Sequence, residues 1–324
     1  MRLLATSIYF SDTFGVSPAV LEDYGAFDIS LVNDLPLFID PFLLFNSSNP
    51  QYRALHEEIV KYVSFLRDKA LSGQLTDGLA REWCMFPEVK QTWLGYSLVG
   101  NAGRGLGESF AFSLRSNLAT VFSNFGREPF SRSAHLEKLC LFDENVGRDN
   151  ISDFVTNLVK AYLLDYTQEF ARLHLAPSLR KTVRVPRVRF NYLTESWESA
   201  RYDLPSFDGD FVLLTPIDLL TKDEAWINRT DFFRDHAEVI RSIENEALRE
   251  QLSGYLTKRL DAITQRDREA RDRTRRESSR RETKANRRRR VQRGTDPTNS
   301  QRAEALMDTL RQYPNLIDLF IRWK

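Results

Sequence analysis

The segment ISDFVTNLVKAYLLDYTQEFARLHL, residues 151–175, decides the fold class of this 324-residue chain. Its large apolar side chains recur every three or four residues and make one broad face: Phe154, Leu158, Tyr162, Leu163, Tyr166 and Phe170. That period is typical of an α-helix that buries one side. The sequence therefore predicts a central core helix.

Helices and strands are expected on both sides of this core helix. The first forty-five residues are rich in β-branched and aromatic side chains broken by prolines, and they predict strands. Helices are predicted at about 50–71 and 77–83, and another is predicted to follow the glycine-rich segment 95–107 and end at Gly126.

Further strands are predicted at 135–142, at 183–193, where apolar residues alternate, and at 210–220, a compact buried run that leads into a helix start at Pro216-Ile217-Asp218. Strands and helices interleave without a repeating βαβ period. The predicted fold class is therefore mixed α+β, an irregular sheet packed by long helices, followed by a helical C-terminal region.

Composition divides the chain at about residue 230. Residues 1–230 are expected to form a mixed α/β body, and residues 231–324 a helical region that runs as continuous helix as far as the break GTDPTNS at 294–300. A terminal helix is predicted at 300–324. Its apolar residues must pack on the preceding helices or on another chain, so a protein partner or a homo-oligomer is one expectation.

The net charge of +1 conceals a strong asymmetry. Residues 258–293, called the basic arm, carry 16 Lys and Arg against 6 Asp and Glu, a net charge of +10. The rest of the chain has 30 basic and 39 acidic residues, a net charge of −9. An acidic body with a basic arm indicates a polyanionic partner.

Four consecutive cations in the arm have no acid beside them: Arg287, Arg288, Arg289 and Arg290. The guanidinium group of arginine can bind two phosphate oxygens at once. The arm has no aromatic residue that could stack on bases. The arm therefore predicts binding to nucleic acid without sequence preference. The alternative is a solvated helix, because Arg and Glu interleave in its first half.

Three carboxylates are candidates for a metal site: Glu137, Asp149 and Asp153. Asp149 and Asp153 are four residues apart, so one helical turn brings them together. Converging carboxylates would bind Mg²⁺ for phosphodiester chemistry. The favoured alternative is structural, with Asp149 or Asn150 as the cap of the following helix.

Two weaker motifs accompany this candidate. Glu88-Val89-Lys90 has the E-x-K spacing of restriction-type nucleases, with Asp77 and Asp40 upstream. The segment around Gly103, Arg104 and Gly105 precedes a predicted helix and would let backbone N–H groups approach a phosphate. It matches neither nucleotide-binding glycine motif, and a tight turn is the favoured alternative.

Several classes of protein are not expected. No apolar run is long enough for a transmembrane helix, and the N-terminus lacks the cleavage pattern of a signal peptide. Cys84 and Cys140 stand in apolar runs and read as buried thiols of a cytoplasmic protein. The four histidines and two cysteines do not fall at zinc-ligand spacing, and no hydrolase triad is apparent.

Five blocks together resemble an uncharacterised family of bacterial proteins associated with mobile elements and phage defence: Asp28–Phe45, Phe86–Gly107, His135–Ala171, Phe190–Trp197 and Leu213–Asp231. Longer members of that family continue into a nuclease-like C-terminal domain. The resemblance implies no activity for this chain. It favours a defence-associated protein that interacts with nucleic acid as a sensing or partner-binding component. The alternatives are a metal-dependent nuclease and a structural interaction protein, and the residues leave open whether the chain is an enzyme.

Overall fold

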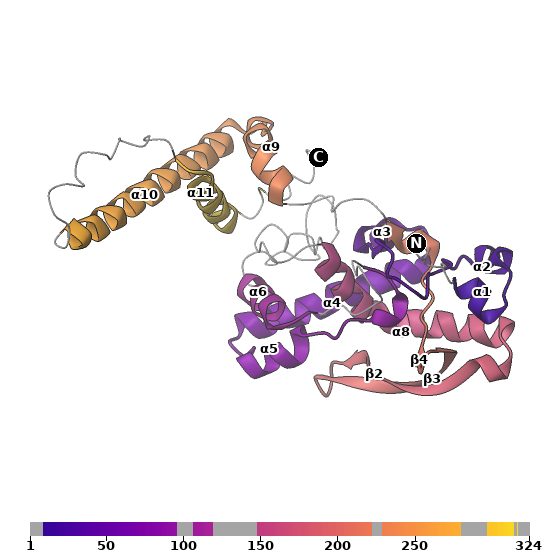
Figure 1. Cartoon of the computed structure of the whole chain (residues 1–324). Coiled ribbons are helices and arrows are strands. Elements are labelled where there is room, and N and C mark those ends of the chain that lie inside the picture. Colours follow the sequence, from indigo (N-terminus) through magenta and orange to yellow (C-terminus); the bar gives the residue numbers. More distant parts are fainter. Residues whose placement is uncertain are drawn as a thin grey trace, which may run out of the picture. The chain divides into compact units, whose positions relative to one another are not determined.

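The computed structural model describes residues 9–95, 106–118, 148–221, 229–279, 297–313 and 316. The chain divides into two compact units, Met1–Trp226 (unit 1) and Ile227–Lys324 (unit 2), whereas the sequence placed the boundary at residue 230 (Figure 1). Helices and small antiparallel sheets confirm the predicted mixed α+β class. None of the described helices is long and apolar enough to cross a membrane.

Unit 1 is built around α8 (Arg148–His174), which confirms the predicted core helix. The helices predicted at 50–71 and 77–83 are also confirmed as α4 (Pro50–Leu71) and α5 (Asp77–Cys84). Both have a side-chain cap, since Asn49 and Thr76 each accept a hydrogen bond from a backbone N–H of the first turn. The helix α6 (Glu108–Leu118) follows the glycine-rich segment, and Gly126, its expected end, lies outside the described residues.

A long antiparallel hairpin lies along α8 (Figure 1). Its strands are β2 (Arg180–Asn191), which the sequence predicted, and β3 (Ser196–Phe207), which it did not. The inward side chains of both strands pack with Leu164 of α8 in one apolar cluster: Val185, Val188, Tyr202 and Leu204. A two-residue turn, Asp208 and Gly209 with φ of 47° and 81°, leads into the short β4 (Asp210–Phe211).

The strands expected in the first forty-five residues are wrong for the described part of that segment. It forms α1 (Phe10–Phe14), α2 (Pro18–Tyr24) and α3 (Pro41–Asn46), and its one strand is β1 (Phe38–Ile39), paired with β5 (Leu220–Thr221). Prolines lack the N–H that a ladder needs, and two glycines in the left-handed region end α1 and α2. The β-branched and aromatic residues fill the core instead.

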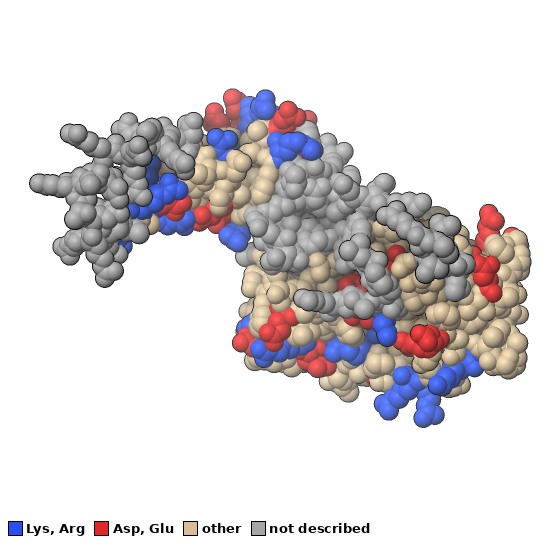
Figure 2. Space-filling model, viewed as in Figure 1, with Lys and Arg blue, Asp and Glu red and all other residues tan. Residues whose placement is uncertain are grey.

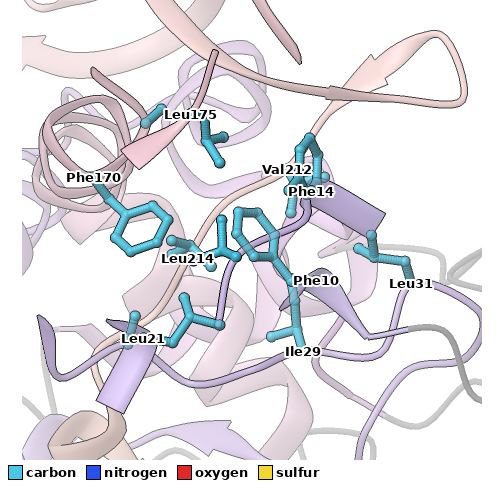
Figure 3. Close-up of a cluster of buried hydrophobic side chains, with 12 residues drawn as sticks. Phe10, Phe14, Leu21, Ile29, Leu31, Phe170, Leu175, Val212 and Leu214 are labelled. Atoms are coloured by element: carbon cyan, nitrogen blue, oxygen red, sulfur yellow. The ribbon is translucent and has the colours of Figure 1, made fainter. Parts of the chain in front are cut away.

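That core is visible in Figure 3. Phe10 and Phe14 lie 4.4 Å apart between ring centroids, and Phe10 meets the edge of Phe170 of α8 at 5.9 Å. Leu214 closes the cluster from the segment 210–220. This segment was predicted as a compact buried strand followed by a helix start, yet it is strand only at its two ends. Residues 212–215 are buried, and Thr167 of α8 accepts a hydrogen bond from the backbone N–H of Leu214 (2.9 Å). The predicted helix start is the 3₁₀ turn η3 (Ile217–Leu219).

Unit 2 consists of α9 (Arg229–Arg241), α10 (Glu246–Ser279) and α11 (Asn299–Gln312). The continuous helix predicted from residue 231 is wrong, because the chain breaks between α9 and α10, where Asn245 caps the second helix. Helix α11 begins with a capping box of Thr298 and Gln301. It ends at Gln312 with Tyr313 as its cap, so the helix predicted at 300–324 is interrupted there. Leu316 is again helical, and residues 317–324 lie outside the described residues.

Candidate functional site

A polar stripe runs along a buried face of α8. Asp153, Asn157 and Lys160 follow at intervals of four and three residues, so they share one face of the helix. Asn157 is 1% exposed and Lys160 is 5% exposed. Buried polar side chains normally have hydrogen-bond partners, so the contacts of this stripe decide whether it is a functional site.

Two hydrogen bonds tie the half of α8 that carries Asp153 to segments from elsewhere in unit 1. The Ser152 hydroxyl accepts one from the backbone N–H of Ile39 (3.0 Å), and the Asn157 side-chain amide donates one to the carbonyl of Pro87 (3.1 Å). The residue that follows each of these backbone partners is an acid, Asp40 after Ile39 and Glu88 after Pro87. The fold thus brings the backbone at these two positions to the half of α8 that carries Asp153.

The structure describes only part of the predicted carboxylate site. Asp153 is half-buried on α8, whereas Glu137 and the side chain of Asp149 lie outside the described residues. In the described ranges, no three His, Cys, Asp or Glu side chains could hold a metal ion. The Mg²⁺ site therefore stays a prediction. The capping role expected for Asp149 or Asn150 is wrong, because α8 is already helical at Arg148.

The E-x-K motif has a structural use in unit 1. Lys90 forms an ion pair with Asp210 (3.2 Å), and Val89 between the two charged residues is buried. Residues from Lys90 onward form a 3₁₀ turn, not the strand that this motif occupies in restriction-type nucleases. The phosphate-binding candidates elsewhere lie outside the described residues: Gly103, Arg104, Gly105, Arg287, Arg288, Arg289 and Arg290.

Lys160 is a buried cation that the sequence did not single out. Burial, reinforced by repulsion from the nearby Arg187 guanidinium, lowers the pKa of Lys160 to about 8. In the part of the chain that the structure describes, its ammonium group has no hydrogen bond and no ion pair. With no acid or nucleophile bonded to it, Lys160 costs stability and forms no catalytic pair with a described side chain.

Arg187, at the bulge of the hairpin, has an unusual backbone conformation and a partly buried guanidinium group. Its backbone is in the left-handed region (φ 53°), and its guanidinium donates to the carbonyl of Glu82 (2.7 Å) at the end of α5. The guanidinium also lies over the rings of Phe86 (5.3 Å) and Trp197 (5.1 Å). Burial lowers the pKa of Arg187. This arginine thus joins the hairpin to α5, and its backbone strain is held by those contacts.

A pocket of about 440 Å³ opens between α4, α8 and the hairpin. Five aromatic side chains from these three elements line it: Tyr62, Tyr162, Phe190, Tyr192 and Trp197. Four charged side chains complete the lining: Glu58, Lys61, Asp165 and Arg189. We call it the aromatic pocket. An apolar wall with a few charged groups is typical of small-molecule sites.

Unit 2 presents a different kind of surface. Figure 2 shows basic and acidic side chains interleaved along α10. Acids of α11 neutralise some of the basic ones, since Asp308 pairs with Arg259 and Glu304 pairs with Arg266 (2.8 Å). Other cations of α10 are exposed and have no ion pair with a described residue: Lys258, Arg271 and Arg273.

The model of a family described as a domain of unknown function, DUF8370, matches residues 15–228. The chain belongs to the DUF8370 family. The match covers nearly all of unit 1, so the polar stripe of α8 and the aromatic pocket both lie in the DUF8370 domain. Unit 2, with α10 and the basic arm, follows the matched residues. Comparison with curated proteins and with solved structures finds no match.

Some features of the DUF8370 domain had a signal in the sequence. Lys160 and Asn157 stand four and seven residues before the buried Leu164, and this helical spacing is a sequence signal that they share its buried face. The run FNYLTESW, 190–197, holds three aromatic residues of the pocket within eight positions. Nothing in the sequence showed that Tyr62 and Tyr162 complete the same wall.

Proposed function

We propose that this DUF8370 protein binds nucleic acid through α10 and the basic arm, by contact with phosphates and without sequence preference. The observation that carries the proposal is the set of exposed cations on α10 that lack ion pairs in the described part of the chain: Lys258, Arg271 and Arg273. Unpaired, solvent-facing cations attract a polyanion, and their contact releases its bound counterions.

The contacts between α11 and α10 end before the charged part of α10 does. The side chain of Gln301, near the start of α11, donates to Asp267 (2.9 Å), and the last buried apolar residue of α10 is Ile263. Beyond these contacts α10 continues to Ser279, and this last part of the helix consists of charged and small polar residues and one alanine. The sequence then adds eight cations against one acid at 280–293. A partner of opposite charge accounts for such a surface better than internal pairing does.

Fluorescence anisotropy with labelled single-stranded and duplex DNA tests the proposal, using the full chain over a range of KCl concentrations. We expect weak binding to both, with a salt dependence that reflects about 5–8 neutralised phosphates. Replacing Arg287–Arg290 with alanine should lower that number by about 3–4. Replacing the same four residues with lysine keeps the charge and should keep the slope.

Two results would overturn the proposal. One is the absence of binding at low salt. The other is a slope that the alanine variant leaves unchanged, which would mean that the arm is a solvated helix. Arg53→Ala combined with Arg172→Ala removes two exposed cations of unit 1 and serves as the control for a general loss of charge.

A Mg²⁺-dependent nuclease that uses Glu137, Asp149 and Asp153 is a second proposal, favoured by one observation. Helix α8 contains both Asp149 and Asp153, which are four residues apart, about one helical turn. Carboxylates are the ligands that Mg²⁺ prefers. Plasmid cleavage that requires Mg²⁺ and is lost in Asp153→Asn, with thermal stability retained, would support it. Absence of cleavage by the wild-type protein in Mg²⁺ would refute it.

A sensing or partner-binding role in defence against phage is proposed on the family resemblance alone. Its test is the plating efficiency of phages on cells with and without the chain. Equal plating across a varied phage panel would argue against it.

A further inference from the structure

We propose that the aromatic pocket of unit 1 binds a nucleoside phosphate, with the base between aromatic rings and the phosphate at Lys61 and Arg189. The proposal concerns the DUF8370 domain alone. It does not depend on binding of nucleic acid by unit 2.

The walls of the pocket suit a flat ring. Phe190 meets Trp197 at 5.3 Å and Tyr192 at 5.2 Å between ring centroids, with the planes 70° and 77° apart. Tyr62 packs edge-on against Phe190 (5.0 Å), which fixes the ring from the side of α4. Rings locked at steep angles to one another leave faces and edges for a further planar group, and nucleobases stack on such side chains. The volume of about 440 Å³ lies in the range of small-ligand sites.

The charges select the ligand class. The Lys61 ammonium lies 4.2 Å from the centroid of Tyr192 and 3.8 Å from a carboxylate oxygen of Glu58. Arg189 of the hairpin pairs with Asp165 of α8 (3.1 Å), with side chains 65% and 52% exposed. Each cation is paired with an acid in a solvent-exposed ion pair. Such pairs contribute little free energy, so a phosphate can replace the acid as the partner of the cation at little cost in free energy.

The two acids give such a ligand further partners. Carboxylates accept hydrogen bonds from ribose hydroxyls and from exocyclic amino groups. A purely apolar ligand, such as an acyl chain, would leave four charged groups of the lining unused. A nucleoside phosphate uses the rings, the cations and the acids together, and for this reason we favour it.

Isothermal titration of the full chain with AMP, adenosine and ribose 5-phosphate tests the inference. We expect AMP to bind with a Kd between about 10 µM and 1 mM, adenosine to bind about tenfold more weakly, and ribose 5-phosphate to show no binding. Equal affinity for adenosine and AMP would overturn the role of the cations. No heat from AMP at about 5 mM would overturn the site itself.

Variants place the ligand in the pocket. Tyr192→Ala should weaken AMP binding about tenfold, and Lys61→Ala should weaken AMP but leave adenosine unchanged. Arg53→Ala is the matched control, an exposed cation of α4 that does not line the pocket. If AMP binding is the same in Tyr192→Ala and Lys61→Ala as in the wild type, the ligand lies elsewhere and the inference fails. Lys61 is exposed, so its replacement leaves folding intact even if Tyr192→Ala does not.

A last arm separates the two sources of the ligand. A pentanucleotide is titrated into the variant with alanine at Arg287–Arg290. Tighter binding than AMP, with the same dependence on Tyr192 and Lys61, supports a nucleotide of a strand as the ligand. Weaker binding than AMP supports a free nucleotide. If polynucleotides bind the arm while AMP does not bind unit 1, only the pocket inference falls.

Discussion

Arg184 of β2 lies directly opposite Arg201 of β3 in the antiparallel register of the hairpin. Both side chains are exposed, and neither forms an ion pair with a described residue. In Figure 2, Lys and Arg side chains extend from the side of unit 1 where Figure 1 draws β2 and β3. Like charges directly opposite one another destabilise a strand pair.

The arginine pair predicts a stabilising substitution. Arg201→Glu should raise the free energy of unfolding of unit 1 by about 0.5–1 kcal/mol, because it replaces repulsion across the strands with an ion pair. Arg201→Ala removes only the repulsion and should gain less. Urea unfolding monitored by circular dichroism measures both. A glutamate variant no more stable than the alanine variant would contradict the register of the pair.

Because Lys160 is a buried cation, its replacement by an apolar residue should raise the stability of the protein by an amount that depends on pH. The pKa of Lys160 falls from 10.5 to about 8 in the folded chain, so between these values the unfolded chain binds a proton that the folded chain lacks. The destabilisation is therefore full below pH 8 and fades as the pH rises toward 10.5. Lys160→Met should stabilise the protein by roughly 1–3 kcal/mol at pH 7 and by less at pH 10.

Thermal unfolding at several pH values measures this difference against the wild type. Lys181→Met, at an exposed position of β2, is the control and should show no such trend. A stability difference between Lys160→Met and the wild type that stays constant from pH 7 to pH 10 would rule out a charged, buried amine.

Two glycines predict opposite effects of the same substitution. Gly209→Ala should destabilise the β3–β4 turn by about 1 kcal/mol, because Gly209 has φ of 81° although an added Cβ would touch nothing. Gly254→Ala, inside α10 and equally free of contacts, should stabilise unit 2 by about 0.5–1 kcal/mol. Denaturant unfolding of the two variants compares them. The same sign of change for both would show that backbone conformation is not the cause.

The interior of unit 2 predicts where α10 opens first. Leu310 of α11 is fully buried, so Leu310→Ala should cost about 2–5 kcal/mol and speed amide hydrogen exchange along the part of α10 near Leu252 and Ile263. Arg311→Ala, at the neighbouring exposed position, should change exchange little. Exchange rates in α8 of unit 1 are the internal reference. Unchanged protection of α10 in Leu310→Ala would mean that α11 does not cover it.

Burial of Leu306, Leu310 and Leu316 also bears on the expected partner of the C-terminal helix. The sequence left open whether these side chains pack on the preceding helices or on another chain. In the described part of unit 2, α11 packs on α10 of the same chain, and its acids Asp308 and Glu304 pair with arginines of α10. A protein partner or a homo-oligomer stays a prediction.

Prediction from sequence failed where strand signals were weak or misleading. The strand β3 was missed because its charged and proline residues hide the alternation, although Asp208-Gly209 is a strong signal for a two-residue hairpin turn. The N-terminal residues have strand composition, but their prolines and helix-ending glycines direct Phe10 and Phe14 into a helix that packs on α8. Composition reports that such residues will be buried and not which backbone carries them.

The sequence by itself determined α4, α5 and α8, because their apolar period is a local property of the chain, and the side-chain caps of α4 and α5 lie within one turn. It also determined the charge of the basic arm, which follows from counting residues. Only the tertiary structure decided that Lys160 and Arg187 lie near one another in a buried setting, and that α4, α8 and the hairpin enclose the aromatic pocket. The physical reason is that burial and electrostatic environment arise from segments that are separated in the sequence, and no local period encodes which of them will meet.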